Sequence, residues 1–356
     1  MGNRRLLTVL FVFGRIFSPL YSLAMRIRAG LYARGILVSI RLPVPVISVG
    51  NLTMGGTGKT PMVIYLARLL SGGLRPGIVS RGYGGKSLQP VNLVSDGARI
   101  LRSPFDVGDE PVLLAQSLSG VPVVTSRKRS SGGAYLVEQG LADILILDDG
   151  FQHLALQRDL NLVLFSAQAS VQSMWVFPGG MLREPHSALE RADCFVVTGV
   201  EGGVSNEAAT LRGWLHENYP QTPVFEGRYE PVGLSCQERG RVGLEGLQSE
   251  SLFAFCGIAN PQSFRQTLER DFSIKGWQSF ADHYPFTRED IEGLARQAAA
   301  LGCTGLITTE KDFVKIKDVV VGLPIWVLAV ELRMGHNFDR FVLDRVGTSG
   351  QRTGSR

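Results

Sequence analysis

The stretch VPVISVGNLTMGGTGKTPMVIYLARLL, residues 44–70, decides the fold class of this chain. Its first seven residues form an apolar, β-branched run typical of a buried parallel strand, and residues 61–70 have helical spacing with proline in the first turn. A glycine-rich segment joins the two. A strand, a glycine loop and a helix in this order bind phosphate, because successive backbone N–H groups and the helix N-terminus point at the anion. The stretch therefore predicts a nucleotide-binding loop.

Eight consecutive loop residues are the candidate nucleotide ligands. They are Thr53, Met54, Gly55, Gly56, Thr57, Gly58, Lys59 and Thr60. We expect Lys59 to reach the β- and γ-phosphates and the Thr60 hydroxyl to bind Mg²⁺. The general pattern G-x-x-x-x-G-K-[ST] has glycine where this chain has Thr53, so the loop departs from it at the first position. The cofactors indicated are ATP and Mg²⁺.

A second apolar run, ADILILDD at residues 142–149, ends in two carboxylates. A carboxylate at the end of a neighbouring strand can bind Mg²⁺ directly or through water. Acidic residues before a glycine are also common in ordinary turns, but the nucleotide loop upstream favours the metal role. Asp148 and Asp149 are therefore candidate metal ligands, and the sequence does not say which is nearer the metal.

Phosphoryl transfer also needs positive charge, positioning and a group that accepts a proton. Asp109 and Glu110 begin an expected helix at 109–119, where acidic side chains also simply stabilise a helix N-terminus. Arg127 belongs to a basic cluster after an expected strand and is either a phosphate contact or a solvated charge.

Three further places are weaker candidates. Tyr83 lies in a glycine loop after a strand, and Arg183 and Glu184 lie in a proline-flanked turn where a surface ion pair is the simpler explanation. His283 follows Asp282, and a neighbouring carboxylate can orient and charge an imidazole. Taken alone, His283 would be interpreted as structural.

The charges are divided unevenly along the 356 residues. The formal net charge is +5, yet the first acidic residue is Asp96, and the 95 residues before it carry twelve lysines and arginines. The remainder has a net charge of −7. Such a basic, apolar block indicates an anionic partner, which could be phosphate, nucleic acid or a membrane surface. The composition, 44% hydrophobic, excludes a disordered chain, and the four widely spaced cysteines indicate neither a zinc site nor a disulfide framework.

Residues 1–32 contain two apolar runs interrupted by Arg15 and ended by Arg26 and Arg28. Neither run reaches the ~18–20 apolar residues that cross a bilayer. A secretory signal is conceivable, but the nucleotide loop requires cytosolic ATP. We expect an amphipathic helix in the headgroup layer of an anionic membrane, and the alternative is a helix that only packs on the domain. Its arginines alternate with long aliphatic runs rather than with stacking aromatics, so nucleic acid is not expected as a partner.

The motifs taken together resemble one family. They are VGNLTMGGTGKTP (49–61), RGYG (81–84), GDEP (108–111), LDDGFQH (147–153), FPGGMLREP (177–185), CGIANPQSF (256–264), FADHYPF (280–286) and TTEKDFVK (308–315). In this order they resemble the tetraacyldisaccharide 4′-kinases, the lipid A 4′-kinases of Gram-negative bacteria. Thr53 in place of the first glycine also fits this family. A single histidine in FADHYPF and Phe313 in TTEKDFVK are small departures that we expect to leave the chemistry unchanged.

The resemblance implies an ATP- and Mg²⁺-dependent kinase that phosphorylates the 4′-hydroxyl of a tetraacylated glucosamine disaccharide 1-phosphate, yielding lipid IVA. The reaction would take place at the cytoplasmic face of the inner membrane, with the protein attached peripherally or monotopically, and we expect a monomer. Asp109 would be the acid/base residue and His283 its partner, with Lys59 and Arg183 also catalytic. Substrate would contact Tyr83, Glu110, Arg127 and Glu184, while Thr60, Asp148 and Asp149 would serve the metal.

The expected fold class is α/β, a P-loop NTPase-like parallel sheet with a second, smaller α/β domain and an N-terminal amphipathic membrane-associated helix. The expected divisions are the helix at 1–32, the kinase domain at 33–222, an extended linker at 223–250, the smaller domain at 251–346 and a disordered tail at 347–356. Closure of the two domains would bring Asp109 to His283.

The main rival is a membrane-associated ATPase switch of the ParA/MinD type, whose loop overlaps GGTGKT. That family has a signature lysine where this chain has Met54, and the motifs DDGFQH and LREP have no function in it. A basic nucleic-acid-binding ATPase is the third possibility.

Overall fold

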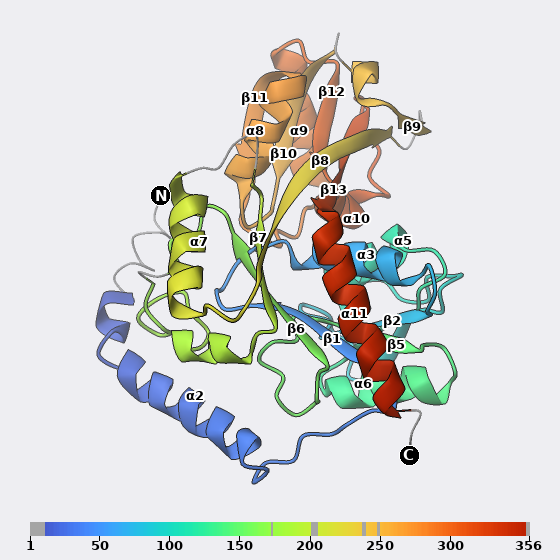
Figure 1. Ribbon diagram of the computed structural model, residues 1–356. Helices are drawn as coiled ribbons and strands as arrows, with labels where there is room; N and C mark the ends of the chain where they lie inside the picture. Colours follow the sequence, from blue (N-terminus) through green and yellow to red (C-terminus); the bar gives the residue numbers. More distant parts are fainter. Residues whose placement is uncertain (1–10, 172–173, 201–205, 237–239, 248–249, 354–356) are drawn as a thin grey trace.

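A computed structural model describes residues 11–171, 174–200, 206–236, 240–247 and 250–353. Its strands join in one 13-stranded sheet with the order β11-β10-β12-β13-β8-β7-β6-β1-β5-β2-β4-β3, and β9 pairs with β8 outside this path. Figure 1 shows two lobes that share this sheet. We call residues 33–222 the first lobe and residues 251–323 the second lobe.

The sheet of the first lobe is almost entirely parallel. Its strands are β1 (Val46–Asn51), β2 (Pro76–Ser80), β3 (Val91–Ser95), β4 (Val123–Ser126), β5 (Ile144–Asp148), β6 (Leu160–Ser166) and β7 (Cys194–Thr198). Only β3 pairs antiparallel, with β4. The helices are α3 (Lys59–Leu70), α4 (Pro104–Val107), α5 (Asp109–Ser117), α6 (Arg129–Glu138) and α7 (Asn206–Asn218), with a 3₁₀ turn at His186–Arg191. The predicted α/β class with a P-loop-like parallel sheet is confirmed.

Both faces of this sheet are covered, as parallel sheets require. Successive residues of β1 point to opposite sides, so Ile47 packs with Met62 and Leu66 of α3, while Val46 packs in the cluster that contains Leu136 of α6. The run of fully buried residues in β1 and β5 explains why these strands are apolar throughout rather than alternating.

The second lobe repeats the α/β pattern on a smaller scale. It contains β10 (Ser251–Cys256), α8 (Pro261–Asp271), β11 (Ser273–Ser279), α9 (Arg288–Ala300), β12 (Gly305–Thr309) and α10 (Glu310–Ile316). Two apolar clusters, one on either side of β10, form its core. Alternate residues of β10 contribute to each of them, as expected for a strand buried on both faces.

A long strand pair joins the lobes. β8 (Val224–Cys236) pairs in parallel with β7 and antiparallel along β13 (Ile325–Met334), and β13 pairs in turn with β12. β9 (Gly240–Val242) and a 3₁₀ turn at Leu244–Leu247 follow β8. The segment expected to be an extended linker is extended, but most of it is a strand of the sheet, because both of its edges find backbone partners.

The C-terminal segment differs from the expectation of a disordered tail after residue 346. α11 (His336–Thr353) returns to the first lobe, where Phe338, Val342 and Val346 join the core that contains β1 and α3 (Figure 1). Once this apolar face anchors the helix, each further residue adds a backbone hydrogen bond at little cost, so the polar end continues as helix.

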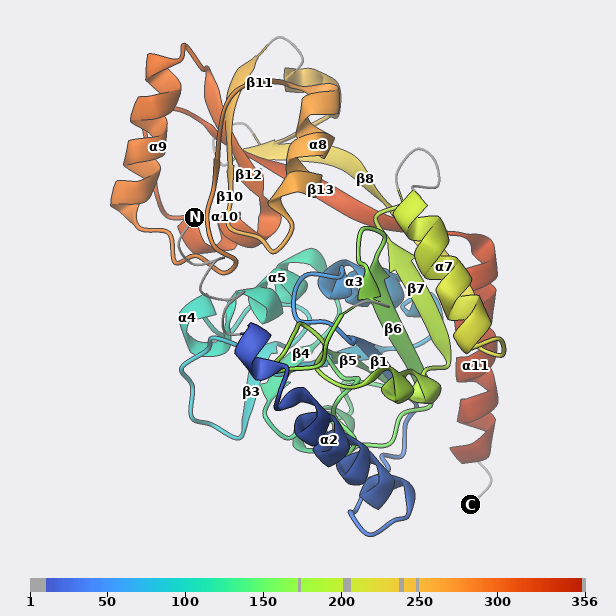
Figure 2. The same cartoon turned by 90° about the vertical axis from the view of Figure 1, so that its left-hand side faces the viewer.

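The N-terminal helix α2 (Ser18–Ala33) lies along the outside of the first lobe (Figures 1 and 2). Ser18 donates a hydrogen bond to the carbonyl of Val176 at 2.7 Å, and Tyr21 donates to the carbonyl of Arg183 at 3.2 Å. Seven apolar side chains in and just before α2 are 53% to 75% exposed: Val12, Phe13, Ile16, Phe17, Leu20, Leu23 and Ile27. Residues 1–10 of the expected helix lie outside the described part of the chain. No helix among the described residues is long and apolar enough to cross a bilayer.

Candidate active site

The predicted nucleotide loop connects the end of β1 to the start of α3. Gly58 has φ +78°, and a Cβ there would lie 1.8 Å from the Tyr229 hydroxyl, so only glycine fits. Thr53 is buried and bridges to Leu182, while the Met54 N–H donates to the carbonyl of Met181 at 2.7 Å. Thr53 thus replaces a glycine where the chain is extended and paired. The strand–loop–helix arrangement is confirmed, and the nucleotide contacts themselves stay predictions.

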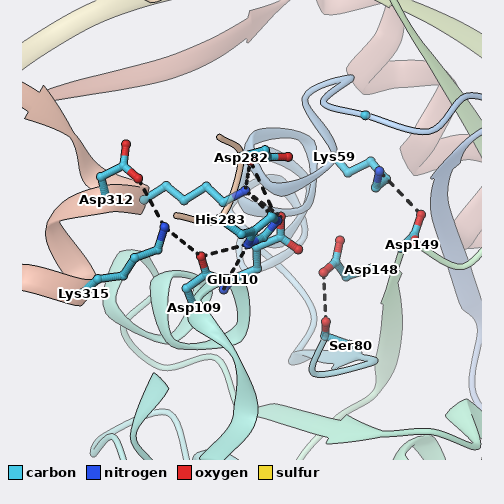
Figure 3. A network of polar contacts seen from close by, with 12 residues as sticks. Lys59, Ser80, Asp109, Glu110, Asp148, Asp149, Asp282, His283, Asp312 and Lys315 are labelled. Atoms are coloured by element: carbon cyan, nitrogen blue, oxygen red, sulfur yellow. Dashed lines mark hydrogen bonds and ion pairs between the residues drawn. The ribbon is translucent and has the colours of Figure 1, made fainter. Parts of the chain in front are cut away.

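Asp149 lies beside two basic side chains at the far end of β5. Lys59 Nζ is 3.5 Å from its carboxylate (Figure 3), and Arg183 donates to both of its oxygens at 2.8 and 2.9 Å. Burial raises the pKa of this carboxyl, but Lys59 and Arg183 outweigh burial and the pKa is lowered. The residue has φ +52°, a left-handed backbone that turns its side chain toward the loop at a cost of about 1 kcal/mol.

Asp148 has a different environment, although it is the preceding residue. Its side chain is fully buried, and its Oδ2 accepts a hydrogen bond from the Ser80 hydroxyl at 2.9 Å. Burial, Glu110 and Asp149 together raise its pKa to about 7. A divalent cation would supply the positive charge that this carboxylate lacks. Within the described residues no three His, Cys, Asp or Glu side chains converge on a metal site, so a metal here would also need Thr60 and phosphate oxygens.

Asp109 is the first residue of α5 and lies at the boundary of the lobes. Gly108 precedes it with φ +91°, and a Cβ there would lie 2.3 Å from the Tyr83 carbonyl, which explains the glycine. His283 Nδ1 is 3.1 Å from each carboxylate oxygen of Asp109, across 174 positions of sequence (Figure 3). The two residues implied by the resemblance as acid/base partners are therefore in direct contact.

The charges around Asp109 keep it ionised. Burial raises the pKa of its carboxyl, but the hydrogen bond with His283 and the charges of His283, Lys311 and Lys315 outweigh burial and lower the pKa to about 2. In the other direction, the hydrogen bond with Asp109 raises the pKa of His283, against burial and the charge of Lys311. The pair is thus an ionised carboxylate that is hydrogen-bonded to an imidazole.

A single cavity of about 1790 Å³ brings most of the predicted site residues together. Its lining includes Met54, Gly55, Gly56, Thr57, Gly58, Lys59, Thr60, Tyr83, Glu110, Arg127, Asp148, Asp149, Arg183, Glu184 and His283. Thr53 and Asp109 are not part of the lining; Thr53 is covered by its strand-like pairing, and Asp109 is reached past His283 and Glu110. The cavity is large enough for a nucleotide together with a second substrate.

The turn that carries Arg183 and Glu184 does not contain a simple surface ion pair. Arg183 pairs with Asp149, while the buried Glu184 accepts from Arg191, whose guanidinium also lies over the ring of Phe151. Arg183 therefore faces the phosphate end of the cavity. Glu184 fixes the turn behind it.

Two basic residues of the site, Lys311 and Lys315, were missed by sequence reasoning, and a third, Arg129, was expected only as a member of the basic cluster that contains Arg127. Arg129 is buried. Burial lowers the pKa of its guanidinium, and the charges of Asp148 and Asp149 raise it in part. Lys311 Nζ is 3.0 Å from His283 Nε2, and Lys315 Nζ is 3.4 Å from Asp109. The available signal was the motif TTEKDFVK, to which no function was given, with two lysines four positions apart on a short helix.

Comparisons with known proteins identify the family to which this chain is similar. The family described as Tetraacyldisaccharide-1-P 4′-kinase matches residues 10–347. The Tetraacyldisaccharide 4′-kinase of Desulfotalea psychrophila is 44% identical over 345 residues, 96% of this chain and 99% of the relative. That of Syntrophus aciditrophicus is 42% identical over 341 residues, 92% of this chain and 91% of the relative.

One solved structure is similar over nearly the whole chain. It is the crystal structure of LpxK from Aquifex aeolicus, described as an "apo" form in complex with ATP. The TM-score is 0.74 at 33% identity, and the match covers 93% of this chain and 97% of that chain.

Proposed function

The chain belongs to the tetraacyldisaccharide 4′-kinase family, and on that premise we propose that it transfers the γ-phosphate of ATP to the 4′-hydroxyl of a tetraacylated glucosamine disaccharide 1-phosphate. The product would be lipid IVA, an intermediate of lipid A biosynthesis. The observation that supports this most is the shared cavity, which has the glycine loop and Lys59 on one side and His283, the hydrogen-bond partner of Asp109, on the other.

ATP is assigned to the first lobe. The backbone N–H groups of the loop and the N-terminus of α3 would bind its phosphates, with Lys59 at the β- and γ-phosphates. Mg²⁺ fits the same place, because the buried Asp148 carboxylate lies beside Asp149, and among the described residues its hydrogen-bond partner is the uncharged Ser80. Thr60, Asp148 and Asp149 would hold the ion, which neutralises charge on the transferring phosphoryl group when bound.

The acceptor hydroxyl is assigned to Asp109. Because this carboxyl is ionised at neutral pH, it can accept the hydroxyl proton as the oxygen attacks phosphorus. His283 orients the carboxylate through Nδ1. Arg183 and Lys59 supply fixed positive charge, which stabilises the charge spread over the phosphoryl oxygens. Tyr83, Glu110, Arg127 and Glu184 are assigned to the substrate side of the cavity.

Peripheral attachment to an anionic membrane is assigned to α2. The seven exposed apolar side chains in and just before α2 form an apolar surface that water solvates poorly, and Arg15, Arg26 and Arg28 are close in sequence to them. A tetraacylated disaccharide substrate would be reached most easily from the bilayer surface. We therefore expect the protein at the cytoplasmic face of the inner membrane, as a monomer.

The test is to incubate the purified protein with ATP labelled in the γ-phosphate, Mg²⁺ and the acylated disaccharide 1-phosphate in detergent micelles. We expect label in the lipid, at the 4′ position. ATP hydrolysis without labelled lipid would contradict the proposal and would favour an ATPase switch of the ParA/MinD type. Omission of Mg²⁺ is the matched control for the metal, and we expect it to abolish transfer.

A further inference from the structure

Two lysines of α10 reach the carboxylate–imidazole pair from the second lobe. α10 begins after Thr309, whose side chain accepts a hydrogen bond from the Asp312 N–H and caps the helix. Lys311 and Lys315 are four residues apart and so lie on the same side of this helix. Glu110 of α5 is 3.3 Å from Lys311, and Asp109 is 3.4 Å from Lys315, so both lysines form ion pairs across the two lobes.

Lys311 contacts the ring nitrogen of His283 that Asp109 leaves free. Its Nζ is 3.0 Å from Nε2, while Nδ1 is 3.1 Å from Asp109. Burial disfavours the charged lysine, but Glu110, Asp282 and Asp109 outweigh burial and raise the pKa of Lys311. An ammonium group has donors only, so Nε2 must be an acceptor in this contact. With Lys311 charged, this contact favours the neutral ring with its proton on Nδ1 directed at Asp109, and it opposes the hydrogen bond with Asp109, which raises the pKa of His283.

Lys315 is connected to the same pair through Asp312. It is 3.2 Å from Asp312, whose fully buried carboxylate also accepts from the Gly257 N–H at 2.8 Å. The Gly257 carbonyl accepts in turn from the backbone N–H of His283, which has the left-handed φ of +59°. Figure 3 shows Lys315 between Asp312 and Asp109. α10 thus fixes both the backbone that carries His283 and the carboxylate that His283 contacts.

We propose that Lys311 and Lys315 are positioning residues of the reaction: Lys311 holds His283 in the Nδ1–H tautomer, and Lys315 orients the Asp109 carboxylate. The inference rests on the proposed kinase function. Because Nε2 is occupied by Lys311, the proton of the acceptor hydroxyl goes to Asp109 rather than to His283. The pair is assembled only when α10 is against α5, so a lobe that has moved away lacks an oriented base.

The competing explanation is that the lysines only stabilise the contact between the lobes. Ion pairs in such places often contribute little, and their loss would change stability without changing the ionisation of His283. The charged groups that face His283 are Asp109 and Glu110 from α5, Asp282 from its own loop, and Lys311 from α10. Its ring also lies near Tyr83. Of these, only Lys311 opposes protonation of Nε2 by direct contact.

The direct test is nitrogen NMR of the full-length protein labelled in its histidine rings, with the His283 signals assigned by their loss in His283→Gln. In the wild type we expect a proton on Nδ1 and a bare Nε2 at neutral pH. In Lys311→Met the opposing charge is gone, so His283 should become protonated at a higher pH. Lys311→Arg keeps the charge and should titrate close to the wild type. Lys275→Met, a surface lysine of the same lobe, is the matched control and should change nothing.

Kinetics provide the second readout. We expect Lys311→Met and Lys315→Met each to lower kcat by about tenfold, a fraction of the full effect of a general base, with KM for ATP unchanged. In Lys311→Met the acid limb of the kcat profile should move to higher pH, together with the titration of His283. Lys315→Met should leave the tautomer of His283 as in the wild type.

Three outcomes would overturn the inference. They are a wild-type His283 with its proton on Nε2, an unchanged His283 titration in Lys311→Met, or wild-type kcat in both methionine variants. If Lys311→Met does not fold, the wild-type tautomer and the Lys311→Arg titration still decide. If the wild type does not phosphorylate the disaccharide, the proposed function fails, while the NMR result on the tautomer stands by itself.

Discussion

Asp148 and Asp109 are both buried carboxylates of the first lobe, yet the protein shifts their pKa values in opposite directions. That of Asp148 is raised to about 7, and that of Asp109 is lowered to about 2. Burial raises both. The difference comes from the neighbours: Asp148 has Glu110 and Asp149 beside it, whereas Asp109 has His283, Lys311 and Lys315.

This contrast separates two uses of a buried carboxyl group. Asp109 receives its positive charge from the protein and is ionised in advance, as a base requires. Asp148 has neighbouring carboxylates that favour a cation, and this is the environment expected for a metal ligand. Each of the following experiments changes one side of the comparison, beginning with the largest expected effect.

Lys59→Ala removes the cation of the phosphate end. We expect kcat to fall by about 10³-fold and the affinity for ATP to decrease, because the lysine contacts phosphate oxygens in both the ground state and the transition state. Radiolabel transfer and nucleotide titration of the same preparation measure the two effects. Lys275→Ala serves as the control for loss of a lysine. Undiminished transfer by a folded Lys59→Ala protein would remove this residue from the site.

Asp109→Asn removes the ionised carboxylate of the acceptor end while keeping its shape. We expect kcat to fall by about 10²-fold or more with the affinity for ATP unchanged, since Asp109 is not one of the residues assigned to the nucleotide. Asp109→Asn should therefore lose turnover alone, whereas Lys59→Ala should lose both turnover and affinity for ATP. Normal product formation by this variant would exclude Asp109 from the base function.

The stability of the two asparagine variants should change with opposite sign. At pH 7 without Mg²⁺, Asp148→Asn removes a carboxyl that is buried among like charges, and we expect a gain of about 1–3 kcal/mol in the free energy of unfolding. Asp109→Asn leaves the lysines of α10 without their carboxylate, and we expect a loss of about 2 kcal/mol. Chemical denaturation measures both. A change of the same sign in the two variants would contradict the assignment of charges.

Acidification should distinguish the same two groups by their pH windows. The pKa of Asp109 is about 2 when folded, below its ordinary 3.8, so its stabilisation is present above pH 3.8 and is lost as the pH falls from 3.8 to 2. The free energy of unfolding should decrease by at most about 2 kcal/mol over this range. The pKa of Asp148 is raised, so its unfavourable contribution decreases as the pH falls from about 7 to 3.8.

Unfolding free energies of the wild type and the two variants across this range provide the check. The difference in the free energy of unfolding between wild type and Asp109→Asn should become smaller only below pH 4. The difference between wild type and Asp148→Asn should become smaller between pH 7 and pH 4. Parallel curves for all three proteins would show that neither carboxyl has the environment described.

The parts of the site that were predictable are those made by contiguous residues. The loop at residues 53–60 needs only a strand before it and a helix after it, and both were recognisable from hydrophobic spacing. The contact between Asp109 and His283 came from family resemblance, because no local pattern connects positions 174 residues apart. Lys311 and Lys315 lie in the motif TTEKDFVK, to which no function was given, and their contacts depend on which residues of the other lobe they meet.

Two misjudged segments have the same origin. β8 was expected to be part of an extended linker, and it is extended, but its backbone pairs with β7 and β13. The end of α11 was expected to be disordered because it is polar, but the helix is anchored by apolar residues earlier in it. In both cases the decisive partner is distant in sequence.

By itself the sequence determined the α/β class, the nucleotide loop and the separation of a basic N-terminal block from an acidic remainder, because these depend on neighbouring residues and on composition. Only the tertiary structure decided which of the buried carboxylates meets positive charge and which lysines contact the pair of Asp109 and His283. Those properties are set by burial and by charges within a few ångströms, and the folded chain draws these charges from both lobes.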